Sequence, residues 1–109
     1  LGFLQAREGR LEEALEHLSQ ALEIDPELFE VHRNLGNVLY QQGKIDEAIE
    51  SFDRVLELAP NDAMTHNNLG VVSLEKGDID EAIHHLSEAL KIDPDYRSAQ
   101  ENLDRIQSR

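Results

Sequence analysis

The sequence has no cysteine, no long apolar run and few basic residues. Without cysteine the chain can form no disulfide and carries no thiolate chemistry, which suits a cytoplasmic setting. No apolar stretch approaches the roughly 18 residues of a membrane-spanning helix, so we expect no membrane insertion. The 10 Lys and Arg residues are outnumbered by 23 Asp and Glu residues. The net charge of −13 disfavours nucleic acid and anionic membrane surfaces as partners, and leaves neutral or basic proteins open.

The sequence repeats itself with a period of 34 residues. Residues 32–49, HRNLGNVLYQQGKIDEAI, match residues 66–83, HNNLGVVSLEKGDIDEAI, at eleven of eighteen positions. A third copy, residues 1–15, aligns with residues 35–49. The recurring residues are Gly2, Gly36 and Gly70, then Gly9, Gly43 and Gly77, Ala14, Ala48 and Ala82, and Pro26, Pro60 and Pro94. Such a period indicates a stack of similar structural units.

Each unit is expected to fold as a helix, a turn, a second helix and a loop. Apolar residues recur at helical spacing in two stretches of residues 29–62, namely Val31, Leu35, Val38 and Leu39, then Ile45, Ala48, Ile49, Phe52, Val55 and Leu56. Gly43 is predicted to end the first helix, because glycine adopts the left-handed conformation at little cost. Pro60 separates the second helix from the next unit. Gly36 lies inside a helix, where glycine is unfavourable, and with its repeat counterpart Gly70 it indicates a close helix crossing, at which Ala48 and Ala82 are expected to be nearly fully buried.

This spacing resembles the tetratricopeptide repeat (TPR) family, whose pattern places Leu-Gly, Ala, a large apolar residue and Pro at fixed offsets. The matching residues are His32, Leu35, Gly36, Leu39, Ala48, Phe52 and Pro60, then His66, Leu69, Gly70, Ser73, Ala82, Leu86 and Pro94. The departures are histidine at the usual Trp position and Leu39 and Ser73 at a usual Tyr position. The resemblance covers essentially the whole chain. It implies an all-α solenoid, a right-handed superhelix of antiparallel helix pairs.

The predicted array has about three repeats and a final helix, in which Ala99, Leu103 and Ile106 continue the apolar stripe. The expected boundaries are 1–28 for an N-terminally truncated first repeat, 29–62 for the second, 63–96 for the third, and 97–109 for a capping helix or the start of a fourth repeat. The first repeat lacks the positions that precede its Leu-Gly pair, so we expect upstream sequence to be missing. Leu1 and Leu4 would then be poorly covered and could cause self-association.

The acidic residues concentrate in the predicted second helices. Residues 11–23, 45–57 and 79–91 carry net charges of −4, −4 and −2, whereas residues 30–42 and 64–76 in the first helices each sum to zero. The resemblance implies that first helices line a concave groove and second helices lie mainly outside. The acidity is therefore expected on the outside, as a solvated face or as a docking surface for a basic partner.

By the same resemblance, a peptide-binding groove is expected at Arg33, Asn34, Asn37, Tyr40, Gln41, Met64, Asn67, Asn68, Val71, Asn102 and Arg105. Asn34, Asn68 and Asn102 are again 34 residues apart. An amide both donates and accepts, so a row of amides can bond to the backbone of an extended ligand. The peptide-binding arms of O-GlcNAc transferases carry a similar row. We predict that Asn34 and Asn68 are unpaired within the protein; the alternative is that asparagine is simply common at this family position.

Other kinds of site find little support in the sequence. Met64 and Asn68 stand where co-chaperone repeats that bind C-terminal carboxylates have lysine and arginine. His84 and His85 are adjacent and would point in different directions on a helix, while His32 and His66 are expected at the edge of the core. No metal site or cofactor is therefore expected. No nucleophile–base pair or phosphate loop is present, so we expect no enzymatic activity in these residues.

The sequence therefore predicts a protein–protein interaction module that binds an extended or helical peptide of a partner. One alternative is a substrate-recruiting segment of a larger enzyme, such as a glycosyltransferase. Another is a scaffold that assembles with itself.

Overall fold

The computed structural model describes the backbone of residues 2–108 and the side chains from Gly9 to Ser108. Within these residues all regular structure is helical, which confirms the all-α prediction. The helices are α1 (Gly2–Ile24), α2 (Phe29–Gln41), α3 (Ile45–Leu58), α4 (Ala63–Glu75), α5 (Ile79–Ile92) and α6 (Arg97–Gln107). They form two compact units, Leu1–Leu58 and Ala59–Arg109. None of the described helices combines the length and the apolar character that crossing a membrane requires.

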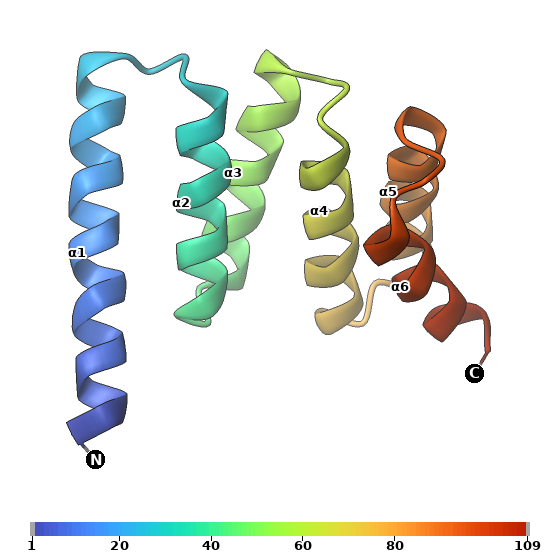
Figure 1. The fold of residues 1–109 in the computed structure, drawn as a ribbon, viewed down its shortest axis with the longest axis horizontal. Helices are drawn as coiled ribbons and strands as arrows, with labels where there is room; N and C mark the ends of the chain where they lie inside the picture. The colour runs from blue at the N-terminus through green and yellow to red at the C-terminus, as the bar shows by residue number, and fades with distance from the viewer. Residues whose placement is uncertain (1, 109) are drawn as a thin grey trace. The chain divides into compact units, whose positions relative to one another are not determined.

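Glycine turns join the two helices of the second and third repeats. Gly43 has a φ of 81° and follows α2, and Gly77 has a φ of 83° and follows α4. The backbone N–H of Lys44 donates to the carbonyl of Leu39 at 2.9 Å, which closes the end of α2. The chain therefore reverses, and α3 runs back along α2 within its unit, as α5 does along α4 (Figure 1). The predicted turns at both glycines are confirmed.

In the second repeat, α2 and α3 approach closely at Gly36. A Cβ atom at this position would lie 2.5 Å from the ring of Phe52, closer than a carbon atom can normally come. Phe52 is fully buried, and so is Ala48 one turn earlier on α3. The ring of Phe52 thus occupies the space that the missing side chain leaves.

The third repeat repeats this crossing with a different large residue. A Cβ atom at Gly70 would lie 2.7 Å from Cγ of Leu86 and 3.3 Å from the carbonyl oxygen of Ala82. Both Leu86 and Ala82 are fully buried. The prediction that repeated glycines mark close helix crossings, with buried alanines opposite, is confirmed in both repeats.

The first repeat departs from its sequence prediction. The prediction of a turn at Gly9 is wrong, because α1 runs through this residue as one 23-residue helix. A Cβ atom at Gly9 would meet nothing within 4 Å, as at Gly43 and Gly77, so the surrounding space does not decide between helix and turn. The neighbouring residues, Ala6, Arg7, Glu8 and Arg10, are good helix formers, and a glycine costs a helix interior only about 1 kcal/mol.

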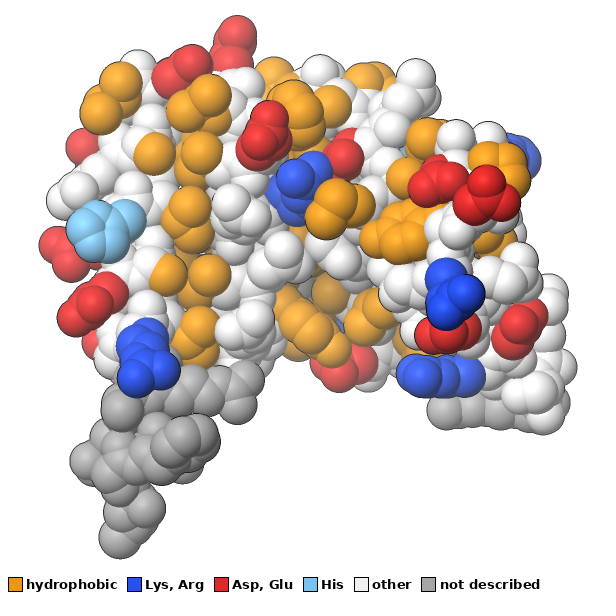
Figure 2. Space-filling view, viewed as in Figure 1, with side chains coloured by type: hydrophobic (Ala, Val, Ile, Leu, Met, Phe, Trp, Pro, Cys, Tyr) orange, Lys and Arg blue, Asp and Glu red, His pale blue; other side chains and the backbone are white. Residues whose placement is uncertain are grey.

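The described part of α1 is less covered than α3 or α5. Its apolar residues Leu11, Ala14, Leu15 and Leu18 are each only partly buried. Figure 2 shows a column of hydrophobic side chains exposed on the surface over α1 and its neighbour α2. Leu1 and Leu4, which the sequence predicted to be poorly covered, lie outside the described side chains.

The last helix, α6, packs against α5. Ala99 is fully buried and Leu103 is 9% exposed, and both join a hydrophobic cluster with Leu86 and Ala89. Asp104, which stands where the other repeats have their internal glycine, is exposed. The predicted apolar stripe of this helix is confirmed.

Candidate binding surface

Two of the predicted groove residues are brought together between α4 and α6. Nδ2 of Asn102 donates to Oδ1 of Asn67 at 3.1 Å, and Nδ2 of Asn67 lies 3.4 Å from Oγ of Ser98. Asn67 is only 6% exposed. These amides therefore satisfy part of each other's hydrogen-bonding capacity and join the two helices, since a buried amide without partners would be costly.

Met64, Asn68 and Val71 lie around this amide pair on α4. Their spacing of three to four residues places them on one side of the helix. The side chain of Met64 is 49% exposed, while Asn68 and Val71 are half-buried. Arg105, on α6, is exposed. This part of the surface thus combines an accessible apolar side chain with amides.

The remaining predicted groove residues lie on α2. Arg33, Asn37 and Tyr40 are half-buried, and each already interacts with another group of the chain. Asn34 and Gln41 are exposed. Arg33, Asn37, Tyr40 and Gln41 follow helical spacing and share one side of α2.

The asparagine row is not uniform. Asn34 is exposed, whereas Asn68 already interacts with another group of the chain, so the expectation that Asn68 is unpaired is wrong. Asn102 is bonded to Asn67. Asn102 finds this partner because α6 packs close to α4 in the C-terminal unit.

Histidine at the usual Trp position ties the preceding loop to the first helix. Nε2 of His32 lies 2.9 Å from the carbonyl oxygen of Pro26, and Nε2 of His66 lies 3.1 Å from that of Pro60. Because a carbonyl oxygen only accepts, the ring nitrogen donates in both cases. His32 is half-buried and His66 is 9% exposed, which agrees with their predicted place at the edge of the core.

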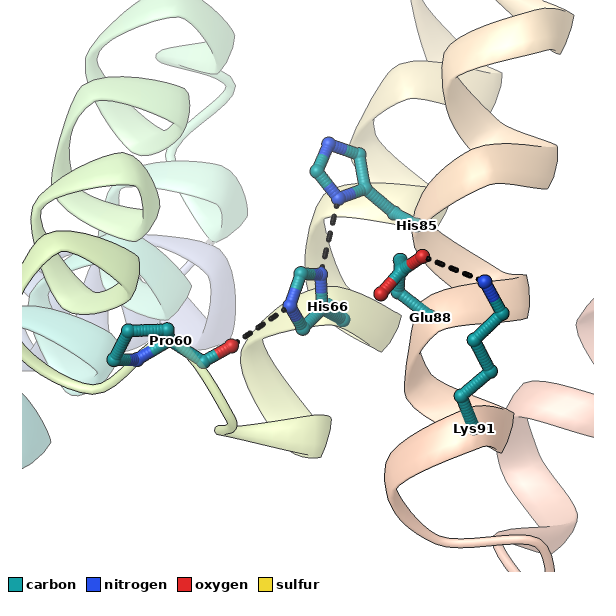
Figure 3. Close-up of polar contacts among 5 residues, drawn as sticks. All are labelled: Pro60, His66, His85, Glu88 and Lys91. Carbon is teal, nitrogen blue, oxygen red and sulfur yellow. Dashed lines mark hydrogen bonds and ion pairs between the residues drawn. The ribbon is translucent and has the colours of Figure 1, made fainter.

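Sequence reasoning missed a contact between two histidines. Nδ1 of His66 lies 3.2 Å from Nδ1 of His85 on α5 (Figure 3). Burial lowers the pKa of His85, and the nearby His66 and His84 lower it further. No repeated pattern in the sequence marks this contact; the counterpart of His85 in the second repeat is Ser51, which is likewise nearly buried at 9% exposed.

An ion pair lies on the same side of α5. Nζ of Lys91 donates to Oε1 of Glu88 at 3.2 Å, and this hydrogen bond lowers the pKa of the Glu88 carboxyl (Figure 3). Glu88 is therefore ionised at neutral pH. Within the part of the chain that the structure describes, no three His, Asp or Glu side chains gather closely enough to hold a metal ion.

Comparison with protein families identifies the fold. A model described as tetratricopeptide repeat matches residues 27–95, and a model described as TPR repeat matches residues 6–43. The chain belongs to the tetratricopeptide repeat family, whose members generally mediate protein–protein interactions. No curated protein sequence matches it.

Solved structures agree with this assignment. The chain is similar to YrrB, described as a TPR protein with an unusual peptide-binding site, with 30% sequence identity and a TM-score of 0.80 over 93% of the chain. It is similar in fold to MamA, with 23% identity and a TM-score of 0.85 over 99% of the chain. The chain spans 52% of the YrrB chain and 63% of the MamA chain.

Proposed function

We propose that the chain is an interaction module that binds a peptide segment of a partner protein on the exposed sides of its first helices. The observation that carries this proposal is the surface of α4 and α6 around Met64. An exposed methionine stands there beside Val71 and the bonded amides of Asn67 and Asn102. Methionine is flexible and polarizable, so it adapts to varied apolar side chains.

The charge of this surface indicates the kind of peptide. Residues 64–76 have no net charge, while the whole chain carries −13. A basic peptide would be attracted by the overall field, and a neutral or basic peptide would meet no excess of like charge at the contact surface. An acidic peptide would be repelled. The similarity to YrrB, itself described as peptide-binding, supports a peptide ligand over a small molecule.

A binding experiment tests the proposal. The chain is used to capture partners, and the bound segment is mapped with overlapping peptides. Met64→Ala should then weaken the mapped peptide by about 1–2 kcal/mol, roughly 5- to 30-fold in Kd, since truncating an anchoring side chain typically costs this much. Titration calorimetry measures the change.

A matched control distinguishes binding on the first helices from binding on the second helices. Ile79 on α5 is also an exposed apolar residue, with 40% exposure. Ile79→Ala should leave the affinity unchanged. If Ile79→Ala weakens the peptide and Met64→Ala does not, the binding surface lies on the second helices and the proposal is wrong.

The amide of Asn34 on α2 provides an independent test. Asn34 is exposed on α2, so Asn34→Ala tests separately whether this helix contributes to binding, without disturbing the core. We expect a loss of about 0.5–1.5 kcal/mol in affinity. Thermal stability should stay constant or rise slightly, because alanine is the better helix former. Unchanged affinity would exclude Asn34 from recognition, and a concentration-dependent mass in solution would indicate self-assembly instead.

A further inference from the structure

The rings of His66 and His85 connect α4 to α5 through their Nδ1 atoms, 3.2 Å apart. The ring centroids are 5.4 Å apart, with an angle of 34° between the ring planes. His66 is 9% exposed, and the side chain of His85 is 15% exposed. Figure 3 shows the two rings meeting edge to edge between their helices, with Pro60 on the far side of His66.

The partners of the outer nitrogens determine where the hydrogens lie. Nε2 of His66 faces the carbonyl of Pro60 and therefore carries a hydrogen. In neutral His66 the other nitrogen, Nδ1, then has none, so Nδ1 of His85 must donate to it. This leaves Nε2 of His85 without a hydrogen, at 3.5 Å from Oε2 of Glu81, which also has none. In the neutral pair, therefore, Nε2 of His85 and the carboxylate of Glu81 face each other although neither carries a hydrogen.

One added proton can be accommodated without breaking the contact between the rings, although burial of His85 lowers the pKa at which it binds. It binds Nε2 of His85, where it bonds to the Glu81 carboxylate and leaves the contact with His66 intact. The positive charge is then shared, because either Nδ1 atom can hold the hydrogen between the rings. A second proton cannot be accommodated without breaking the contact between the rings. Both Nδ1 atoms would carry hydrogens, their hydrogen bond would be lost, and two positive charges would repel each other across a short distance.

We propose that His66 and His85 form a proton-operated link between α4 and α5, which holds with no more than one added proton and opens when a second proton binds.

The charged groups around the pair come from α5 and the start of α4. Burial has the largest effect on the pKa of His85 and lowers it, followed by the charges of His66 and His84, whereas Glu81 and Glu88 oppose this change. Helix α6 also packs against α5, and its charged residues are Arg97, Glu101, Asp104 and Arg105. None of these four residues is among the groups that shift the pKa of His85.

The sign of the pH effect follows from this lowered pKa. As pH falls below the ordinary histidine value of 6.5, the unfolded chain takes up a proton on His85 before the folded protein does. The folded pair accepts one proton where the two separate side chains accept two. Stability is therefore complete above about pH 6.5 and is lost as pH falls through the histidine range.

Nitrogen-15 NMR of the imidazole rings in the unmodified protein tests the hydrogen positions. At pH 8 we expect a hydrogen on Nε2 of His66 and on Nδ1 of His85. On acidification His85 should take up its proton at a lower pH than an exposed histidine, because burial lowers its pKa. A hydrogen on Nε2 of His85 at pH 8, or a titration of His85 with the midpoint of an exposed histidine, would overturn the proposal.

A variant tests the effect on folding. His85→Ser gives α5 the residue that α3 has at the same repeat position, Ser51. The control is His17→Ser, which removes the exposed histidine at that position on α1. Equilibrium urea unfolding is measured between pH 8 and pH 5.

The wild type and the control should respond alike. Their unfolding equilibrium constant should rise more steeply with acidification than that of His85→Ser, by up to about tenfold per pH unit for each proton that the link excludes. Equal pH dependence of all three proteins would overturn the proposal. If His85→Ser does not fold, the NMR measurement decides.

Discussion

The second and third repeats have the same backbone plan but fill it with different side chains. Gly36 in the second repeat faces Phe52, whereas Gly70 in the third faces Leu86. Both large residues are fully buried. The small residue is kept because the backbones of two helices approach closely there, while the large residue can vary as long as it fills the space. The fold therefore constrains one side of each crossing more than the other.

The edges of the two helix pairs differ more than their centres. His32 and His66 make the same bond to a proline carbonyl. Only His66 meets a second ring, because Ser51 is replaced by His85 in the third repeat. The loop tie thus does not depend on the histidine pair. A titratable contact has been added to one repeat without a change in the backbone plan.

The largest expected effect is a cavity at the crossing. Phe52→Ala should reduce the free energy of unfolding by about 3–5 kcal/mol, and Leu86→Ala by about 2–5 kcal/mol, because both side chains are fully buried. Leu18 holds the same repeat position on α1 but is only half-buried, so Leu18→Ala should cost roughly 1 kcal/mol. Urea unfolding measures all three. Equal losses at the three positions would show that the first repeat is packed as tightly as the others.

Overpacking the small side of the crossing should cost less. Ala48→Leu and Ala82→Leu each insert a larger side chain at a fully buried position, at a cost of about 1–3 kcal/mol. The matched control is Ala14→Leu on α1, where the residue is only partly buried and the extra atoms have room. A melting temperature for Ala48→Leu equal to that of the wild type would mean that the helices do not meet at Ala48.

The glycine itself can be tested with a compensating change. Gly36→Ala places a Cβ atom against the Phe52 ring, and the gain in helix propensity offsets only part of the clash. The expected net cost is about 1–2 kcal/mol. Phe52→Ala removes the ring that the added Cβ atom would meet, so Gly36→Ala should cost less in the Phe52→Ala background than in the wild type, as a double-mutant cycle would measure. Additive losses would argue against direct contact between the two positions.

The parts of the fold that repetition determines were predictable from the sequence. The turns at Gly43 and Gly77, the buried Ala48 and Ala82, and the apolar stripe of α6 all follow from patterns that recur every 34 residues. The turn at Gly9 was predicted by the same logic and is absent. A glycine permits a turn, but only a second helix packing back makes the turn favourable.

The candidate site was less predictable, because its contacts depend on what is unique to one repeat. Asn102 was expected to face a ligand, yet it bonds to Asn67 because α6 packs beside α4. The contact of His66 with His85 requires a histidine at one position on each helix, and the second repeat has Ser51 in place of His85. A repeat pattern averages over such differences and therefore does not reveal them. The binding role of the α2 and α4 residues stays a prediction.

The smallest expected effect concerns the same repeat position where no helix crosses. Asp104 on α6 stands where α2 and α4 have glycine, and it is exposed. Its carboxylate accepts a hydrogen bond of 2.9 Å from Nε2 of Gln100, an exposed contact that stabilises the helix only slightly. Asp104→Ala removes this bond but introduces a better helix former. We therefore expect the free energy of unfolding to change by less than about 0.5 kcal/mol in either direction.

The contrast with Gly36→Ala gives this small effect its meaning. An alanine at this repeat position should lower the free energy of unfolding in α2, where Phe52 packs against it. It should leave the free energy of unfolding nearly unchanged in α6, where the position is exposed to solvent. Both variants are measured by urea unfolding under identical conditions. A loss of more than 1 kcal/mol for Asp104→Ala would mean that this side of α6 is covered in solution.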